Sequence, residues 1–269
     1  MNLGNDGLSS SRARVAAVLR AAKDVISIEL VERTLEVDRK QAAKLLSRWA
    51  SQSWVRRIGR GLYVPLPLEL AGSTQVVEDP WVLVPALFGP SYIGGWTAAH
   101  HWDLTEQLFN ETLVFTAKRV DAPRVDVQGV TFLAHHVASK QLFGLKKVWR
   151  GTTRIQLSDP ARTVIDMLAS PKVGGGIDQV AECLAAFHKT QRDNGRLLVS
   201  YAEQFGNGAV FKRLGFLAEN VLSDHDLATA CRERLTKGYA LLDPSLKRNH
   251  LVTAWHLWVP DRWKQRGTQ

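Results

Sequence analysis

Hydrophobic residues recur with the period of a helix in two adjacent stretches near the N-terminus. The apolar positions of the first stretch are Ile28, Val31 and Leu35, which repeat at i, i+3 and i+7. Those of the second are Ala42, Leu45, Leu46 and Trp49, which share one side of a helix drawn at 100° per residue. Ser27 and Asp38 stand immediately before the two stretches, where their side chains can cap a helix. The pattern predicts two short helices joined by a tight turn, with Val37 packed beneath the turn.

The other side of the second helix is cationic and carries no acid. Its residues are Lys40, Lys44, Ser47, Arg48 and Ser51. When a helix-turn-helix protein binds DNA, its second helix lies in the major groove with its N-terminal residues at the base edges. Glutamine can pair with adenine there, and arginine or lysine with guanine. We therefore expect DNA contacts from Arg39, Lys40, Gln41, Lys44, Ser47 and Arg48.

A short β-hairpin is expected directly after this helix. Residues 54–58 and 62–64 have strand character, and Gly59-Arg60-Gly61 between them supplies glycines for positive φ. On this hairpin Arg56, Arg57 and Arg60 would project toward phosphates or the minor groove. The two helices and the hairpin together predict a winged helix-turn-helix. The alternative is a solvated basic helix followed by an ordinary hairpin.

Charge is concentrated in the same part of the chain. The whole sequence carries a net charge of +9, and residues 1–64, with 12 basic and 6 acidic residues, contribute +6 of it. Such an excess favours a polyanionic partner for this region. We expect a DNA-binding domain at 1–66, with a loose start at 1–10 and a helix at 11–23. A linker at 67–78 and a larger domain at 79–269 follow.

The C-terminal domain is expected to be mixed, with strands before helices. Expected strands are 112–117, 130–137, and a hairpin of 148–150 with 153–157; expected helices are 81–88, 96–104, 160–168, 177–189, 195–205, 209–222 and 224–235, before further strands at 239–242 and 250–259. Residues 92–95 are expected to form a turn, and Gly174–Gly176 a flexible break. This order favours an α+β fold: a winged helix-turn-helix plus a larger mixed α+β domain.

Catalytic chemistry is not apparent in the C-terminal domain. The histidine pairs at 100–101 and 135–136 are adjacent residues, which point in different directions on a helix or a strand. Ser223 and Asp226 resemble a helix capping box, and the triple glycine lacks the lysine of a phosphate loop. Cys183 and Cys231 are expected to be buried thiols. We expect no catalytic site, metal or cofactor.

Aromatic residues are expected to build the core rather than to stack on bases. The chain has nine tryptophans. We assign Trp96, Trp102, Trp149, Trp255 and Trp258 to the core of the C-terminal domain. No apolar run is long enough to span a membrane, and the first fourteen residues lack an apolar core. A cytoplasmic protein that does not bind membranes is therefore expected.

Four motifs in order resemble the AbiEi-type antitoxins, the transcriptional regulators of type IV toxin–antitoxin and abortive-infection systems. They are Gly59-Arg60-Gly61-Leu62-Tyr63-Val64, the stretch YIGGWTAAH at 92–100, SDPARTVID at 158–166, and RLGFL at 213–217. Together they extend the resemblance over roughly residues 12–260. The glycines at 174–176 and the length of the 66–79 segment depart from it.

The resemblance implies a non-enzymatic autorepressor and antitoxin. Its N-terminal winged helix-turn-helix would bind double-stranded DNA at inverted repeats in its own promoter, by dimers or by cooperative monomers. Its C-terminal domain would counter a nucleotidyltransferase-like toxin, with or without direct contact. Two alternatives remain open at this point. One is a nuclease or nucleotidyl-processing enzyme guided by the DNA reader, and the other is a ligand-sensing transcriptional regulator.

Overall fold

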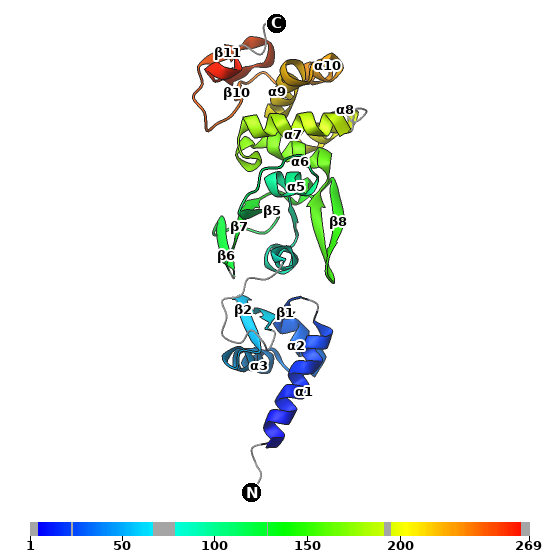
Figure 1. The fold of residues 1–269 in the computed structure, drawn as a ribbon, viewed down its shortest axis with the longest axis vertical. Helices are drawn as coiled ribbons and strands as arrows, with labels where there is room; N and C mark the ends of the chain where they lie inside the picture. Colours follow the sequence, from blue (N-terminus) through cyan, green and yellow to red (C-terminus); the bar gives the residue numbers. More distant parts are fainter. Residues whose placement is uncertain (1–4, 23, 67–78, 128, 191–194, 265–269) are drawn as a thin grey trace.

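The chain has a mixed α+β fold in which three groups of elements follow one another along the long axis (Figure 1). The computed structural model describes residues 5–22, 24–66, 79–127, 129–190 and 195–264. The predicted linker at 67–78 lies outside the described residues. An N-terminal unit comes first, a six-stranded sheet follows, and a helical region with a small second sheet completes the chain. The α+β prediction is confirmed.

The N-terminal unit combines three helices with a three-stranded antiparallel sheet. Its elements are α1 (Asn5–Ala21), β1 (Ile26–Ser27), α2 (Ile28–Leu35), α3 (Arg39–Ser51), β2 (Val55–Gly59) and β3 (Leu62–Pro65), with strand order β1-β3-β2. The core of the unit consists of Val18, Ile26, Val31, Ala42, Leu46, Trp49, Val55 and Tyr63. The apolar period in the sequence therefore marks the packed faces of α2 and α3.

Both helix caps form as the sequence predicts. Ser27 Oγ accepts a hydrogen bond from the Leu30 amide at 3.2 Å, and Asp38 Oδ1 accepts one from the Gln41 amide at 2.8 Å. Between the helices Glu36 adopts a left-handed conformation, with φ at 52°. These caps satisfy amides that have no partner within their helices, and they fix where α2 and α3 begin.

Replacing Asp38 by alanine is expected to lower the free energy of unfolding by about 1 kcal/mol, because the first turn of α3 loses its acceptor. Asp38→Asn is the matched control, since an amide oxygen can accept the same bond and should retain most of the stability. Thermal melting followed by circular dichroism measures both variants. If Asp38→Asn melts at the same lowered temperature as Asp38→Ala, the charge of Asp38, and not its hydrogen-bond acceptor, stabilises α3.

Two local expectations for this unit were wrong. The N-terminal helix begins at Asn5, so residues 5–10, which were expected to be loose, are helical. The turn of the β2–β3 hairpin contains only Arg60 and Gly61, because Gly59 pairs with Leu62 inside the sheet. Only Gly61 of these glycines takes a positive φ, of 74°. The extra strand residue arises at an irregularity in register between Arg57 and Gly59.

The central sheet has six strands in the order β6-β7-β5-β4-β9-β8. They are β4 (Ser91–Ile93), β5 (Glu111–Thr116), β6 (Arg124–Val127), β7 (Val130–His136), β8 (Leu145–Arg150) and β9 (Thr153–Ser158). The pairs β5–β7 and β4–β9 are parallel, and the other neighbours are antiparallel. Residues 92–95 were expected to form a turn, but Tyr92 and Ile93 are fully buried in β4.

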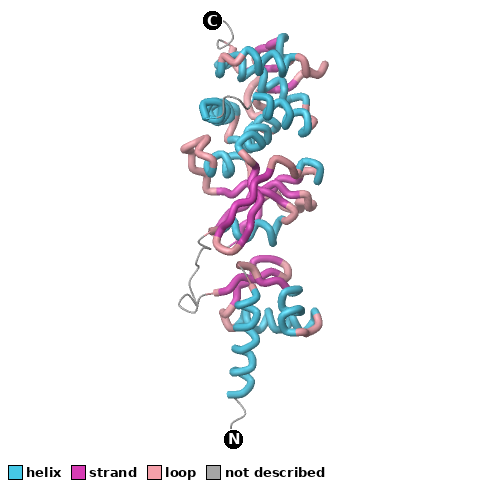
Figure 2. Tube along the Cα trace, turned by 90° about the vertical axis from the view of Figure 1, so that its right-hand side faces the viewer, coloured by secondary structure: helices cyan, strands magenta, loops and turns pink. Residues whose placement is uncertain are grey.

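Helices cover both faces of this sheet (Figure 2). On one face η2 (Pro80–Leu83) and α4 (Val84–Phe88) pack through Leu83 and Phe88 onto Ile93, Val114 and Phe132. On the other face Tyr92, Leu113 and Phe115 pack with Trp96 of α5 (Gly95–His101) and with Val173 of η4 (Pro171–Gly174). The strands therefore alternate between two apolar layers.

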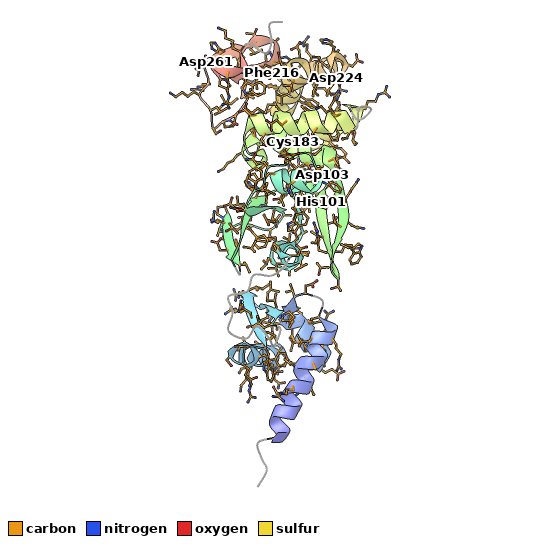
Figure 3. All side chains as sticks on the ribbon, in the orientation of Figure 1. His101, Asp103, Cys183, Phe216, Asp224 and Asp261 are labelled. Carbon is orange, nitrogen blue, oxygen red and sulfur yellow. The ribbon has the colours of Figure 1, made fainter. Side chains whose placement is uncertain are left out.

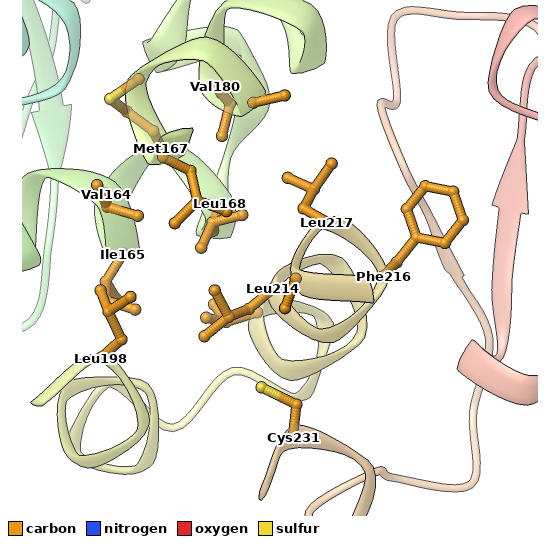
Figure 4. Close-up of a cluster of buried hydrophobic side chains, with 14 of the residues drawn as sticks. Val164, Ile165, Met167, Leu168, Val180, Leu198, Leu214, Phe216, Leu217 and Cys231 are labelled. Atoms are coloured by element: carbon orange, nitrogen blue, oxygen red, sulfur yellow. The ribbon is translucent and has the colours of Figure 1, made fainter. Parts of the chain in front are cut away.

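The helical region forms the largest core of the molecule. It comprises α6 (Pro160–Ala169), α7 (Ile177–Thr190), α8 (Gly195–Phe205), α9 (Gly208–Leu217), the π-helical turn η6 (Ala218–Leu222) and α10 (His225–Arg232). Figure 4 shows Leu214 and Leu217 of α9 facing Leu168 of α6. Gly215 lies against Trp255, and a Cβ there would stand 2.0 Å from the indole Cζ3 atom.

Two predictions about turns in this region, the role of Ser223 and the triple glycine, were wrong. The N-cap of α10 is Asp224, whose Oδ1 accepts from the Leu227 amide at 2.9 Å. Ser223, with a φ of 55°, instead ends η6 as its C-cap residue. The triple glycine is no loose break, because Asp243 Oδ2 accepts from the Ile177 amide at 2.9 Å directly after it. In both cases the prediction missed which carboxylate accepts a hydrogen bond from the first amides of the following helix.

A small second sheet closes the fold. Its strands are β10 (Ala240–Leu241), β11 (His250–Val252) and β12 (Leu257–Val259), in the order β10-β12-β11. Single 3₁₀ turns at η3 (Ser139–Gln141), η7 (Thr253–Trp255) and η8 (Asp261–Trp263) complete the described elements. Every helix of the described residues is too short or too polar to cross a lipid bilayer.

The N-terminal unit is packed against the central sheet. Val64 belongs to the same apolar cluster as Leu83 and Phe88, and Val25 and Ile58 pack against that cluster. Thr153, at the start of β9, donates a hydrogen bond to Asp24, and Thr152 does so at 3.3 Å. The N-terminal unit and the central sheet therefore meet through both apolar contacts and hydrogen bonds.

Candidate nucleic-acid interface

The polar face of α3 is open to solvent. Lys40, Gln41, Lys44, Ser47 and Arg48 are all exposed, while Ala42, Leu46 and Trp49 on the opposite face are fully buried. Among the described residues, Lys40, Lys44 and Arg48 form no ion pair. Three cations with no acidic partner on one helix face create a positive potential along that face, which attracts a polyanion.

Arg39 is less available than its position suggests. Its guanidinium lies 2.8 Å from Glu29 Oε1 and 3.6 Å from Glu32 Oε2, both on α2. The hydrogen bond from Arg39 lowers the pKa of the Glu29 carboxyl. The sequence prediction treated α3 alone and missed this pairing. The available signal was the acid pair at i and i+3 on α2, which the turn brings to the start of α3.

The β2–β3 hairpin presents its arginines unequally. Arg57 and Arg60 are exposed, and Arg56 is partly buried. Arg57 Nε donates to the Gly59 carbonyl at 3.1 Å, which holds the guanidinium close to its own turn. The opposite side of the hairpin faces α4, where a Cβ at Gly59 would lie 3.4 Å from Leu87 Cδ2. Among the hairpin arginines, Arg57 and Arg60 are therefore the ones exposed to a ligand.

Other candidate groups do not combine into a reactive site within the described residues. No group of three or more His, Cys, Asp or Glu is placed to hold a metal ion in that part of the chain. Burial raises the pKa of Cys183 to about 11 and that of Cys231 to about 12, so both thiols stay protonated and unreactive at neutral pH. Cys183 lies inside α7, and His101 and Asp103 lie at the end of α5 (Figure 3).

A buried ionic network lies at the centre of the molecule. Arg162 Nε and Nη2 donate to Asp166 Oδ1 at 3.0 and 2.9 Å, and Nη2 also donates to Tyr92 Oη at 2.8 Å. Arg162 Nη1 donates to the carbonyls of Gln141 and Phe143. Arg162 and Tyr92 have no exposed surface. Each strong donor of the guanidinium therefore has an internal acceptor, and the network ties α6 to β4 and to the segment that leads from η3 into β8.

Comparison with known proteins informs the fold and not the activity. No protein-family model and no curated protein matches this sequence. Among solved structures, the chain is similar to the crystal structure of the RV2827C protein from Mycobacterium tuberculosis, with a TM-score of 0.60 and 14% sequence identity. The likeness covers 93% of this chain and 91% of that chain, so the two proteins share the arrangement of the whole fold.

Proposed function

We propose that this chain is a sequence-specific DNA-binding protein that represses its own promoter. The observation that carries the proposal is the exposed face of α3, with Lys40, Lys44 and Arg48 unpaired among the described residues. The α2–turn–α3 arrangement followed by the β2–β3 hairpin fits a winged helix-turn-helix, in which α3 enters the major groove. Gln41, Lys44 and Ser47 are then the candidates nearest the bases, and Arg57 and Arg60 contact the backbone.

Binding of the chain to its own upstream DNA tests this proposal directly. A fluorescence-anisotropy titration at about 150 mM salt compares that DNA with a scrambled duplex of equal length. Binding at least about 10³-fold tighter to the upstream DNA is expected of a specific reader. Equal and weak binding to both duplexes would show that α3 is only a general basic surface, and it would contradict the proposed autorepressor function.

We further propose that the protein is the antitoxin of a type IV toxin–antitoxin operon. Support comes from the resemblance of the four sequence motifs to AbiEi-type antitoxins. In that role residues 79–269 counter a nucleotidyltransferase-like toxin encoded beside this gene. Co-expression with the neighbouring gene tests it: growth should recover with the full chain, and also with a variant that no longer binds DNA. Failure of the full chain to restore growth would remove the antitoxin role and leave the repressor.

Replacing Arg39 by alanine is expected to change DNA affinity much less than replacing Lys40 or Lys44. The Arg39 guanidinium already pairs with the Glu29 carboxylate, so it is not a free cation for DNA. Its removal leaves the Glu29 carboxylate without this partner near the proposed interface. The slope of log K against log salt, measured by anisotropy at several salt concentrations, should change by less than the loss of one phosphate contact would cause. A loss as large as that of Lys44→Ala would show that Arg39 leaves Glu29 when DNA binds.

A further inference from the structure

The β8–β9 hairpin has an outward face that no element of the described structure covers. Trp149, which the sequence assigned to the core, is 62% exposed at its tip. Arg154 lies directly opposite Trp149 across the strand pair, and Lys147 precedes it by two residues on the same face. Lys147 and Arg154 are also exposed. The assignment of Trp149 to the core was therefore wrong, because its neighbours in the hairpin are cations and not apolar side chains.

Trp149 and its two cationic neighbours have no partners among the described residues. No ring stack, cation–ring contact or hydrogen bond involves the indole, and no ion pair involves Lys147 or Arg154. From Leu145 to Ser158 the chain contains four basic residues and no acid. An isolated indole with a cation on either side gives an apolar surface inside a positive field.

The reverse face of the hairpin is anchored. Arg150 lies over the Trp81 ring at 4.5 Å and 3.5 Å from the Asp79 carboxylate, and Lys146 Nζ lies 5.2 Å from the centre of the Trp102 ring. Thr153 holds Asp24 of the N-terminal unit, and Figure 1 shows the hairpin extending from the sheet toward that unit. Trp149 is thus displayed on a fixed ribbon. Less side-chain and backbone freedom is lost when a ligand binds to such a ribbon.

We propose that this face, defined by Lys147, Trp149 and Arg154, binds single-stranded DNA, with one unpaired base stacked on the Trp149 indole and adjacent phosphates held by the two cations. Single-strand sites elsewhere combine aromatic platforms with a basic track in this way. A paired duplex offers no free base face to the indole. A protein partner is disfavoured because hot-spot residues lie in well-packed pockets from which water is excluded, whereas this indole lies on an open strand pair between exposed cations. The site is separate from α3 and does not require the proposed repressor function.

A fluorescein-labelled oligothymidylate, titrated with the full chain and followed by anisotropy, tests the site. Trp149→Ala is expected to weaken binding about tenfold or more, whereas Trp149→Phe, which keeps a stacking ring, should stay within about threefold of the wild type. Lys147→Ala with Arg154→Ala should weaken binding and flatten its salt dependence. The matched control is Lys247→Ala with Arg248→Ala, which removes two exposed cations elsewhere and should change nothing.

The same oligonucleotide separates this site from the proposed DNA reader. A variant with Lys40, Lys44 and Arg48 replaced by alanine should lose the promoter duplex and keep the oligothymidylate, and Trp149→Ala should do the reverse. Unchanged binding by Trp149→Ala, or a Trp149→Phe variant as weak as Trp149→Ala, would overturn the stacking site. An oligouridylate RNA bound at least ten times more tightly would overturn the assignment to DNA. Melting curves of all variants should match, because these side chains are exposed.

Discussion

Replacing Lys40, Lys44 and Arg48 together by alanine is expected to abolish high-affinity binding to the promoter. Each of these exposed cations can neutralise one phosphate or read one base edge, and the release of bound counterions makes the affinity salt-dependent. Loss of three phosphate contacts should reduce the slope of log K against log salt by about 3. Titrations of the wild type and the triple variant at several salt concentrations measure both quantities.

The matched control is a triple variant that removes equal charge elsewhere. Lys140, Lys247 and Arg248 are exposed cations of the C-terminal part and form no ion pair with described residues. Their replacement by alanine lowers the net charge by the same amount, and it should leave the slope nearly unchanged if α3 is the interface. A slope that falls equally in both triple variants would mean that overall charge, and not the face of α3, drives binding.

Local patterns predicted most of the N-terminal unit because its elements are short-range. The apolar period and two polar caps fix α2 and α3 within a few residues of Ser27 and Asp38. Such local patterns cannot predict which side chains of different elements pair with one another. Arg39 faces Glu29 only after the turn folds one helix back on the other.

The central sheet was harder to predict for a related reason. The strand Ser91–Ile93 is only three residues long and is followed by two glycines, so locally it resembles a turn. Its position between β5 and β9 comes from pairing with strands distant in sequence. Trp149 shows the same limit. Its large apolar side chain suggested burial. The face of the hairpin on which it lies, however, is set by the strand register that pairs it with Arg154.

The Arg162 network supports a second strong expectation, which concerns stability. Asp166 is buried beside Arg162, and desolvation outweighs the attraction of the guanidinium, so the pKa of the Asp166 carboxyl rises to about 6. A carboxyl whose pKa is higher in the folded state than in the unfolded state binds its proton more tightly when folded. This residue therefore stabilises the fold most at low pH, and its contribution falls as the pH rises from about 4 to about 6.

Replacing Arg162 by methionine is expected to lower the free energy of unfolding by about 3–5 kcal/mol at pH 8, because it leaves a buried carboxylate without its cation. Without the guanidinium, the pKa of Asp166 should rise further, since Arg162 is the main influence that lowers it. At pH 5.5 the carboxyl of the variant is protonated in the fold, so the loss should be smaller. Urea unfolding at both pH values measures the difference.

Removing both charges separates the ionic cost from the loss of packing. The variant Arg162→Met with Asp166→Leu has no buried carboxyl, so it should be more stable than Arg162→Met by about 2 kcal/mol at pH 8 and should not share its pH dependence. Full recovery is not expected, because the carbonyls of Gln141 and Phe143 still lack their donor. A double variant no more stable than the single one would place the penalty in those carbonyls and in the ring contacts of Arg162 with Phe143 and Phe205. The network would then act as a support for the chain entering β8, with the charge of Asp166 incidental to stability.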